Sequence, residues 1–320
     1  MSDRTCQSAA RSVRARQRIG ELIYQTPLLP AQVLGNRAGC DLRFKAENFQ
    51  LTGSFKMRGA ASKMTALEPG QKLITASSGN HGIASSRAAS LTGQNLTVVL
   101  PETVARTKLE KIQSFGVEVI LHGAESGMAE MHAQELASTG DYEYVSPYND
   151  ADVIAGQGTI GLELLEQVDQ IDNVFISMGG GGLISGIGSV LKSFGGNTRV
   201  IGVSALNSAA LAASMQAGRI VETEHLDTLA DGVAGGVDED SLTLPLALDI
   251  VDRVVTCDEA EIAAALRSLA RDENMLVEGA AALALAGFQQ VSEGVRGQTN
   301  VVLLCGANFD WARISPLALS

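Results

Sequence analysis

The stretch Val174-Phe175-Ile176-Ser177-Met178-Gly179-Gly180-Gly181-Gly182-Leu183 indicates the fold class of this chain. Its first four residues form the short run typical of a buried β-strand, and a helical segment follows. Four consecutive glycines leave backbone N–H groups uncovered and allow positive φ. At a helix start such groups form a concave site for an anion, so the stretch predicts a phosphate-binding turn. The alternative is a tight turn that needs glycine for packing alone.

Two common nucleotide motifs do not fit this turn. No lysine follows the glycines, which disfavours a P-loop. The G-x-G-x-x-G spacing of dinucleotide sites also fails, because Ile184 or Ser185 occupies the third glycine position.

The order of strand and then helix recurs along the chain. Candidate strands are 42–46, 72–75, 95–100, 117–121, 174–177, 200–203, 253–256 and 301–304. Amphipathic segments between them include 82–92, 103–115, 161–168 and 258–272. This alternation predicts an α/β fold with largely parallel sheets. We expect a small domain at 72–147, a large domain from 1–64 and 150–320, and the site in the cleft between them.

Composition excludes several classes of protein. Of 320 residues, 45% are apolar and 19% are charged, which is typical of a globular protein with a substantial core. The net charge of −12 repels nucleic acid and anionic membranes, and no apolar run is long enough to span a membrane.

The cysteines and the N-terminus bear on location. The four cysteines are scattered and form no C-x-x-C pair: Cys6, Cys40, Cys257 and Cys305. This pattern argues against disulfides and a zinc site and predicts a reducing compartment. The N-terminal stretch faintly resembles an organelle transit peptide because it carries five arginines: Arg4, Arg11, Arg14, Arg16 and Arg18. A first amphipathic helix is the preferred interpretation, with Val13, Ile19, Leu22 and Ile23 buried. We therefore expect a cytoplasmic protein.

A second loop, Ala76-Ser77-Ser78-Gly79-Asn80-His81-Gly82, also joins a strand to a helix. Its hydroxyls, amide and backbone donors suit a carboxylate or phenolate oxygen, although Ser and Asn also serve as ordinary helix caps. A hydrogen-bonded structural role for His81 is favoured over catalysis. No metal-ligand spacing relates the other histidines, His122, His132 and His225.

A third element is Ser54-Phe55-Lys56-Met57-Arg58-Gly59-Ala60. A lone lysine is usually a solvated charge, but Lys56 stands between two apolar residues with Arg58 nearby. Desolvation and a neighbouring cation both lower a lysine pKa, which an amine nucleophile requires.

Together these elements resemble the fold-type II pyridoxal-phosphate family, which is tryptophan synthase β-like, and specifically its serine/threonine dehydratase and serine racemase branch. Further matching motifs occur in order along nearly the whole chain: Thr26-Pro27-Leu28, Lys45-Ala46-Glu47-Asn48, Ile154-Ala155-Gly156-Gln157-Gly158-Thr159, Ala230-Asp231-Gly232-Val233 and Cys305-Gly306-Ala307-Asn308. The resemblance implies pyridoxal 5′-phosphate as cofactor, a small amino acid as substrate and a homodimer.

The resemblance also implies roles for individual residues. Lys56 binds the cofactor as a Schiff base and removes the substrate α-proton. Around the cofactor lie Phe55, Asn80, Gly179, Gly180, Gly181, Gly182, Leu183 and Cys305, with Asn80 at the phenolic oxygen and the glycines at the phosphate. The substrate carboxylate is bound by the loop Ser77, Ser78, Gly79, Asn80 and His81. In racemising members, the residue at Ser78 is a second acid/base on the opposite face.

Cys305 matches the position that faces the pyridine nitrogen. A neutral thiol cannot hold that nitrogen protonated, as an aspartate would, so elimination of a β-substituent is favoured over a long-lived carbanion. A buried inert thiol is the alternative.

This sequence departs from the family pattern at two places, and both narrow the predicted function. Ser204 and Ala210 stand where metal-activated members carry acidic residues, so we expect no divalent-cation site. The segment around Ser204 resembles dehydratases of hydroxyectoine breakdown. The chain also ends soon after Asn308, so we expect no C-terminal regulatory domain.

The predicted activity is that of a dehydratase, an ammonia-lyase that converts serine, threonine, 3-hydroxyaspartate or a related β-hydroxy amino acid to a 2-oxo acid and ammonia. A racemase that uses Lys56 and Ser78 is the alternative. The context of Phe55 and Arg58 and the paired serines of the loop disfavour a β-replacement synthase. The intact lysine and loop disfavour a non-catalytic cofactor-binding protein. Tyr148 and Asn149 either reach the pocket or form an ordinary loop.

Overall fold

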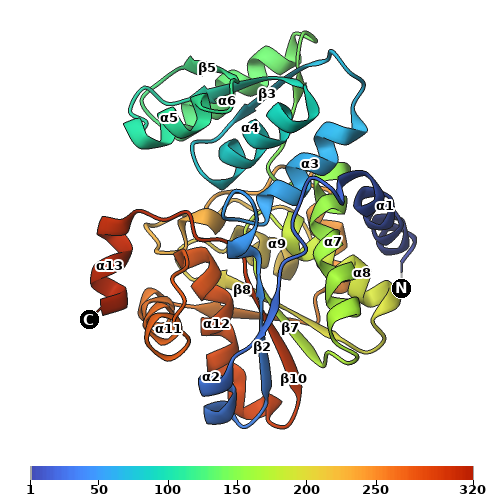
Figure 1. Cartoon of the computed structure of the whole chain (residues 1–320), viewed down its shortest axis with the longest axis vertical. Helices are drawn as coiled ribbons and strands as arrows, with labels where there is room; N and C mark the ends of the chain where they lie inside the picture. Colours follow the sequence, from blue (N-terminus) through green and yellow to red (C-terminus); the bar gives the residue numbers. More distant parts are fainter. Residues whose placement is uncertain (1, 320) are drawn as a thin grey trace.

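The computed structural model describes residues 2–319 of the chain, with side chains described to residue 317. Two sheets of unequal size organise the molecule, and Figure 1 shows the smaller one above the larger one. The predicted α/β class is confirmed, since every strand pair except one is parallel. Among the described residues, no helix is long and apolar enough to cross a membrane.

The larger sheet has six strands in the order β1-β2-β10-β7-β8-β9. Its strands are β1 Leu28–Pro30, β2 Asp41–Ala46, β7 Asn173–Ser177, β8 Arg199–Ala205, β9 Arg253–Cys257 and β10 Thr299–Leu304. Only β1 pairs antiparallel, against β2. The central strands β7 and β10 are buried nearly throughout, which explains their continuous apolar character.

The smaller sheet has four strands in the order β5-β4-β3-β6. These are β3 Lys72–Ala76, β4 Asn95–Leu100, β5 Glu118–Leu121 and β6 Glu143–Tyr144. The sequence prediction found eight of the ten strands within two residues and missed β1 and β6, which have only three and two residues. The domain division at 1–64, 72–147 and 150–320 stays a prediction, and the membership of the two sheets supports it.

Helices cover both sheets. They are α1 Asp3–Ile19, α2 Gln32–Ala38, α3 Lys56–Ala66, α4 Asn80–Thr92, α5 Arg106–Gln113, α6 Ser126–Ser138, α7 Ala151–Gln167, α8 Gly182–Phe194, α9 Ala210–Ala217, α10 Thr243–Ile250, α11 Glu259–Asp272, α12 Gly279–Val291 and α13 Trp311–Leu319. Short 3₁₀ turns are η1 Glu47–Phe49, η2 Asp231–Val233 and η3 Ser292–Val295. Figure 1 shows α11 and α12 on one side of the larger sheet and α7 and α8 on the other.

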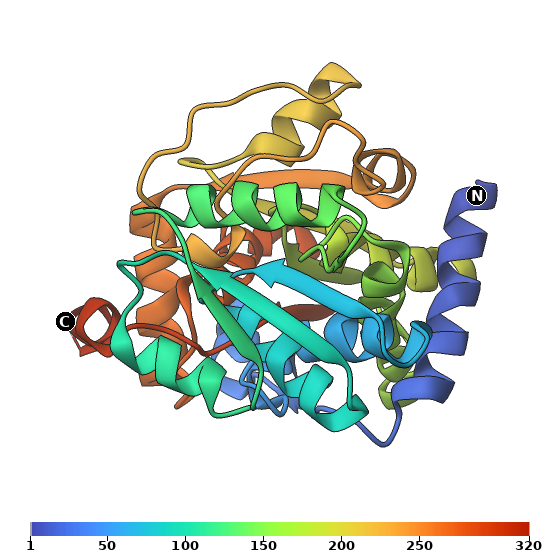
Figure 2. The same cartoon turned by 90° about the horizontal axis from the view of Figure 1, so that it is seen from above.

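The N-terminal helix α1 packs through small residues rather than large ones. Its buried face is Thr5, Ser8, Ala9, Ser12, Ala15 and Ile19. The prediction that Val13 is buried was wrong, because this side chain is 39% exposed. Ile19 is buried as predicted, whereas Leu22 and Ile23 lie beyond the helix end and are half-buried. Figure 2 shows α1 along the edge of the molecule opposite α13.

Helix α7 begins ten residues before the predicted segment 161–168. The glycines at the start of this helix allow close helix packing. A Cβ on Gly156 would lie 2.3 Å from the Arg58 carbonyl oxygen of α3, and one on Gly158 would lie 2.0 Å from Ser12 Oγ of α1. Three helices therefore meet where side chains are absent.

A buried ionic cluster joins α3, α7, η1 and β2. Arg58 donates to Glu47 Oε1 and Oε2 at 2.8 Å each, and to Glu163 Oε1 and Oε2 at 2.6 and 2.9 Å. Lys45 Nζ also donates to Glu163. All four side chains are at most 4% exposed, so two cations and two anions neutralise each other away from water.

The pKa values follow from this pairing. Burial alone would raise the pKa of Glu163, but Arg58 and Lys45 lower it below its ordinary value. Burial lowers the pKa of Lys45, and Glu163 and Glu47 oppose that shift. Removing one member would leave opposite charges buried without partners, which costs far more than losing an exposed pair.

We expect Arg58→Met to lower the free energy of unfolding by about 3–5 kcal/mol, because Glu47 and Glu163 lose their shared cation. Urea denaturation of the cofactor-free protein measures this change. Arg43→Met is the matched control, since its pair with Asp41 is partly exposed and is worth about 0–1 kcal/mol. Equal losses in the two variants would contradict a stabilising role for the buried cluster.

Candidate active site

Lys56 is the first residue of α3 and lies beside the carboxyl end of β10. The N–H of Phe55 donates to the Cys305 carbonyl oxygen at 3.0 Å, and Ser54 pairs with Gly306 in an isolated antiparallel bridge. These contacts fix the start of α3 against the chain that leaves β10. Lys56 Nζ donates to the carbonyl oxygen of Pro147 at 2.7 Å and lies 5.2 Å from the centre of the Phe55 ring.

The amine of Lys56 is less basic than an exposed lysine. Burial lowers its pKa to about 8, while Cys305 and Glu278 oppose the shift. The prediction that Arg58 contributes to this lowering was wrong. The Arg58 guanidinium forms its ion pairs with Glu47 and Glu163, which cancel its charge. A neutral amine is therefore accessible near physiological pH.

The glycine turn lies where β7 ends and α8 begins. Only Gly181 has a positive φ, at +88°. A Cβ would lie 2.6 Å from the Val233 carbonyl oxygen at Gly179, and 2.6 Å from the Tyr148 ring at Gly180. The first N–H groups of a helix have no partner within it, so the start of α8 offers donors to an anion. Close packing therefore requires these glycines, and the same turn is open to an anion at the start of α8.

Tyr148 reaches the glycine turn, whereas Asn149 contacts the segment 238–242. Besides the ring contact with Gly180, the Tyr148 hydroxyl accepts a hydrogen bond from the Asp238 N–H at 2.8 Å. Asn149 Nδ2 donates to Asp238 Oδ2 and Asp240 Oδ1, at 3.1 Å each. The geometry favours contact with the site for Tyr148, while Asn149 joins its own loop to residues 238–242.

The serine loop leads from β3 into α4. The Gly79 N–H donates to Ser77 Oγ at 3.2 Å, which shapes the turn before Asn80. His81 points away into the small domain, where Nε2 lies 2.9 Å from Thr75 Oγ1 and 3.0 Å from the Val145 carbonyl oxygen. Burial, and then Lys56, lower its pKa to about 3. The side chain of His81 is therefore neutral and structural.

Glu278 is a central residue that the sequence analysis missed. Asn80 Nδ2 donates to its Oε1 and Oε2 at 2.8 and 3.0 Å, and the Asn308 N–H donates to Oε2 at 3.1 Å. Asn308 Nδ2 donates in turn to Asn80 Oδ1 at 2.7 Å. Burial raises the pKa of Glu278 to about 7, although both asparagines oppose the shift. The sequence did offer one indication of a buried functional carboxylate, since Glu278 is the single acidic residue in the apolar run 275–286.

Cys305 follows β10 directly and is 2% exposed. Its Sγ lies 3.9 Å from Glu278 Oε1. Burial and the neighbouring Glu278 carboxylate raise the thiol pKa well above its ordinary value. The thiol is therefore neutral, as the sequence analysis expected for this position.

Contacts bring together most of the predicted site residues. Phe55 is hydrogen-bonded to Cys305, and Cys305 and Asn80 both contact Glu278. Lys56 is hydrogen-bonded to Pro147, whose neighbour Tyr148 packs against Gly180. Ser78 is half-buried in the same turn as Asn80, and Leu183 is buried at the start of α8. His81 is the exception, because its side chain leaves the loop.

This arrangement fits pyridoxal 5′-phosphate. A phosphate needs a cradle without side chains at a helix start, and the glycine turn supplies one. The cofactor aldehyde needs a neutral amine, which Lys56 supplies. No group of three His, Cys, Asp or Glu side chains within the described residues is arranged to hold a metal ion.

Comparisons with known proteins agree with this geometry. Residues 19–306 match the family model described as "Pyridoxal-phosphate dependent enzyme". The catabolic L-threonine dehydratase of Escherichia coli is 34% identical over 310 residues, which are 95% of this chain and 94% of that protein. The processed threonine deaminase isoform 2 of Solanum lycopersicum superposes with a TM-score of 0.94 at 31% identity, over 99% of this chain and 89% of that one. Maize serine racemase superposes with a TM-score of 0.89 at 30% identity, over 96% of this chain and 95% of that one.

We expect the rate of cofactor uptake by the cofactor-free protein to rise with pH and to level off above about pH 8. Only the neutral amine of Lys56 reacts with an aldehyde, and its pKa is about 8 rather than 10.5. Stopped-flow absorbance after mixing with pyridoxal phosphate, between pH 6.5 and 10, measures this rate. Lys56→Ala is the control and gives no covalent adduct. A rate that keeps rising to pH 10 would refute the lowered pKa.

Gly180→Ala should lower cofactor affinity by at least about tenfold, because its Cβ would displace the Tyr148 ring that lies 2.6 Å away. Fluorescence titration of the cofactor-free protein measures the dissociation constant. Gly127→Ala is the matched control, since its Cβ meets nothing within 4 Å. Unchanged affinity in Gly180→Ala would show that the turn tolerates a side chain.

Proposed function

The chain belongs to the family of pyridoxal-phosphate dependent enzymes, and we propose that it is a dehydratase that converts L-threonine or L-serine to a 2-oxo acid and ammonia. Pyridoxal 5′-phosphate is its cofactor, and the enzyme is a lyase. The observation that carries the proposal is the amine of Lys56. Burial lowers its pKa to about 8, and its Nζ donates to the carbonyl oxygen of Pro147, the neighbour of the Tyr148 ring that packs on Gly180.

Each part of the site has a task in this reaction. When bound, pyridoxal phosphate withdraws electrons from the substrate α-carbon. Lys56 holds the cofactor covalently and, once released, accepts the α-proton at Nζ. A pKa of about 8 suits a general base that works near neutral pH.

The remaining residues bind and orient. The N–H groups of Gly179–Gly182 would hold the phosphate, and Asn80 would donate a hydrogen bond to the phenolic oxygen of the ring. The backbone of Ser77–His81 binds the substrate carboxylate. Cys305 would face the ring nitrogen as a neutral thiol, because burial raises its pKa. Such a partner would not hold the nitrogen protonated, which would favour loss of the β-hydroxyl over racemisation.

Racemisation is the second candidate, and it rests on Ser78. This serine lies half-buried in the loop that precedes Asn80. Its hydroxyl would serve as the acid or base on the face opposite Lys56. The likeness to maize serine racemase supports this candidate. The homodimer and the cytoplasmic location stay proposals that rest on the family resemblance and on composition.

The decisive experiment measures 2-oxo acid release from L-threonine, L-serine and their D-enantiomers. We expect release from L-threonine or L-serine, and a loss of about 10²–10⁴-fold in kcat in Lys56→Ala, because the α-proton has no base. Ser78→Ala separates the two candidates, since it should spare elimination from the L-substrate and abolish inversion. Inverted enantiomer without 2-oxo acid would establish a racemase and overturn the dehydratase.

A further inference from the structure

Glu278 lies directly before α12 and is 3% exposed. A polar residue at this position often caps the first N–H groups of the helix, but the Glu278 side chain makes no such bond. None of the ion pairs within the described part of the chain includes it. Its carboxylate is directed to Asn80 instead, 198 residues earlier in the chain. The stability of α12 therefore does not explain this buried acid.

The side-chain amide of Asn80 is held at both ends. Its Nδ2 donates to the two carboxylate oxygens of Glu278 at 2.8 and 3.0 Å, and its Oδ1 accepts from Asn308 Nδ2 at 2.7 Å. A reversed amide would place a carbonyl oxygen against a carboxylate and two N–H donors against each other. The amide of Asn80 therefore has a single favourable orientation.

Asn308 is itself held independently of Asn80. Its Nδ2 donates to the Thr52 carbonyl oxygen at 2.7 Å, and its Oδ1 accepts from Lys111 Nζ at 3.2 Å. A carbonyl oxygen only accepts and an ammonium group only donates, so these partners fix the orientation of Asn308. Asn308 thus decides which end of the Asn80 amide is the nitrogen, and Glu278 is the group that holds this nitrogen in place.

The space around the Glu278 carboxylate is closely fitted. A Cβ on Gly306 would lie 2.7 Å from Oε1 and 2.9 Å from Oε2, and one on Gly232 would lie 3.5 Å from Oε1. The Asn308 N–H also donates to Oε2, at 3.1 Å. The carboxylate therefore occupies a space that two glycines leave open, and it has little freedom to move within it.

Exposure separates the tasks of Asn80 and Glu278. Asn80 is half-buried, so a ligand in the site can contact it, whereas Glu278 is almost completely covered. A side-chain amide nitrogen carries two hydrogens. One of them, shared between the two carboxylate oxygens, satisfies Glu278. The second hydrogen of Asn80 Nδ2 is then free for a ligand.

We propose that Glu278 is a positioning residue, which holds Asn80 so that this second hydrogen is presented to the phenolic oxygen of the cofactor. The inference rests on the contact between Asn80 and that oxygen in the proposed function. A hydrogen bond to an ionised oxygen is stronger than one to a neutral oxygen, so the position of Asn80 sets how much of the bound cofactor carries the ionised form. Glu278 acts through Asn80 and does not itself contact the cofactor.

Two variants separate the position of the carboxylate from its charge. Glu278→Gln keeps the length and one acceptor oxygen but loses the charge, whereas Glu278→Asp keeps the charge but withdraws it by one carbon–carbon bond. We expect Glu278→Asp to bind pyridoxal phosphate about tenfold more weakly and to lower the ionised fraction, and Glu278→Gln to retain most of both. Fluorescence titration of the cofactor-free protein measures the affinity, and the absorbance spectrum of the loaded protein measures the ionised fraction.

The same variants in an Asn80→Ala background complete the test. Asn80→Ala alone should weaken cofactor binding by about tenfold, and adding Glu278→Asp should cause no further loss, because the residue through which Glu278 acts is gone. An equal loss from Glu278→Asp with and without Asn80 would overturn the proposal. A larger effect of Glu278→Gln than of Glu278→Asp would also overturn it, in favour of a direct effect of the charge.

Two further outcomes have a defined meaning. If Glu278→Asp does not fold, Glu278→Gln still tests the proposal, because a changed spectrum with the acceptor oxygen retained would overturn it. Unaltered affinity and spectrum in Asn80→Ala would overturn both the positioning role of Glu278 and the proposed contact of Asn80. The dehydratase itself is judged separately, by 2-oxo acid release from the unaltered protein.

Discussion

A guanidinium that does not contact water holds this structure together. Arg58 lies in the first turn of α3 and binds two buried carboxylates, Glu47 from η1 and Glu163 from α7. Buried charges are tolerated only when they are paired and hydrogen-bonded, so these elements cannot move apart independently. Lys56 is two residues away on the same helix turn. The position of the reactive amine therefore follows from an ionic cluster that takes no part in the chemistry.

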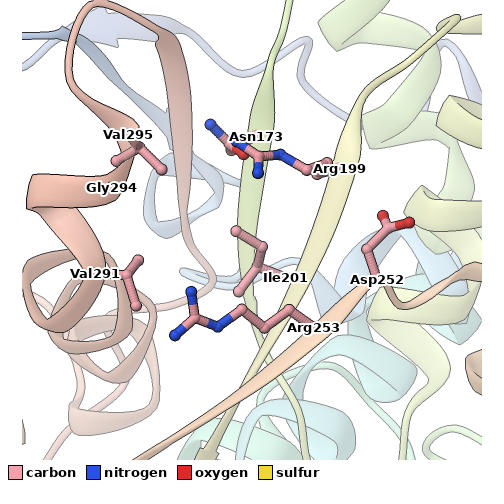
Figure 3. A pocket seen from close by; sticks show the side chains of 8 residues that line it. All are labelled: Asn173, Arg199, Ile201, Asp252, Arg253, Val291, Gly294 and Val295. Carbon is pink, nitrogen blue, oxygen red and sulfur yellow. The ribbon is translucent and has the colours of Figure 1, made fainter.

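The carboxyl edge of the larger sheet positions the candidate site. At the carboxyl ends of β7 and β10, loops bring the glycine turn and Cys305 to the same place as Lys56. Ligands of parallel sheets generally bind at this edge. At the amino ends, Arg253 of β9 lies opposite Ile201 of β8, two residues after Arg199 (Figure 3).

Prediction from sequence succeeded where structure is local. Eight strands were found because buried parallel strands are short apolar runs, and the glycine turn and the lysine motif are contiguous in the chain. It failed for the start of α7, which contains Gly156 and Gly158. Glycine is needed at these positions because α3 and α1, which are distant in sequence, pack closely against them. It also failed for Val13, since the partner of α1 decides which of its faces is buried.

The amino-acid sequence by itself determined the α/β class and the cofactor family, and it singled out Lys56 as the candidate Schiff-base lysine, because each depends on residues that are neighbours along the chain. Only the tertiary structure decided the electrostatics of the site. Glu278 meets Asn80 across 198 residues of sequence, and Arg58 meets Glu163 across 105. Such pairs decide which charges are neutralised and which pKa values move. No local pattern records them, since Coulomb energy depends on distance in space and on burial.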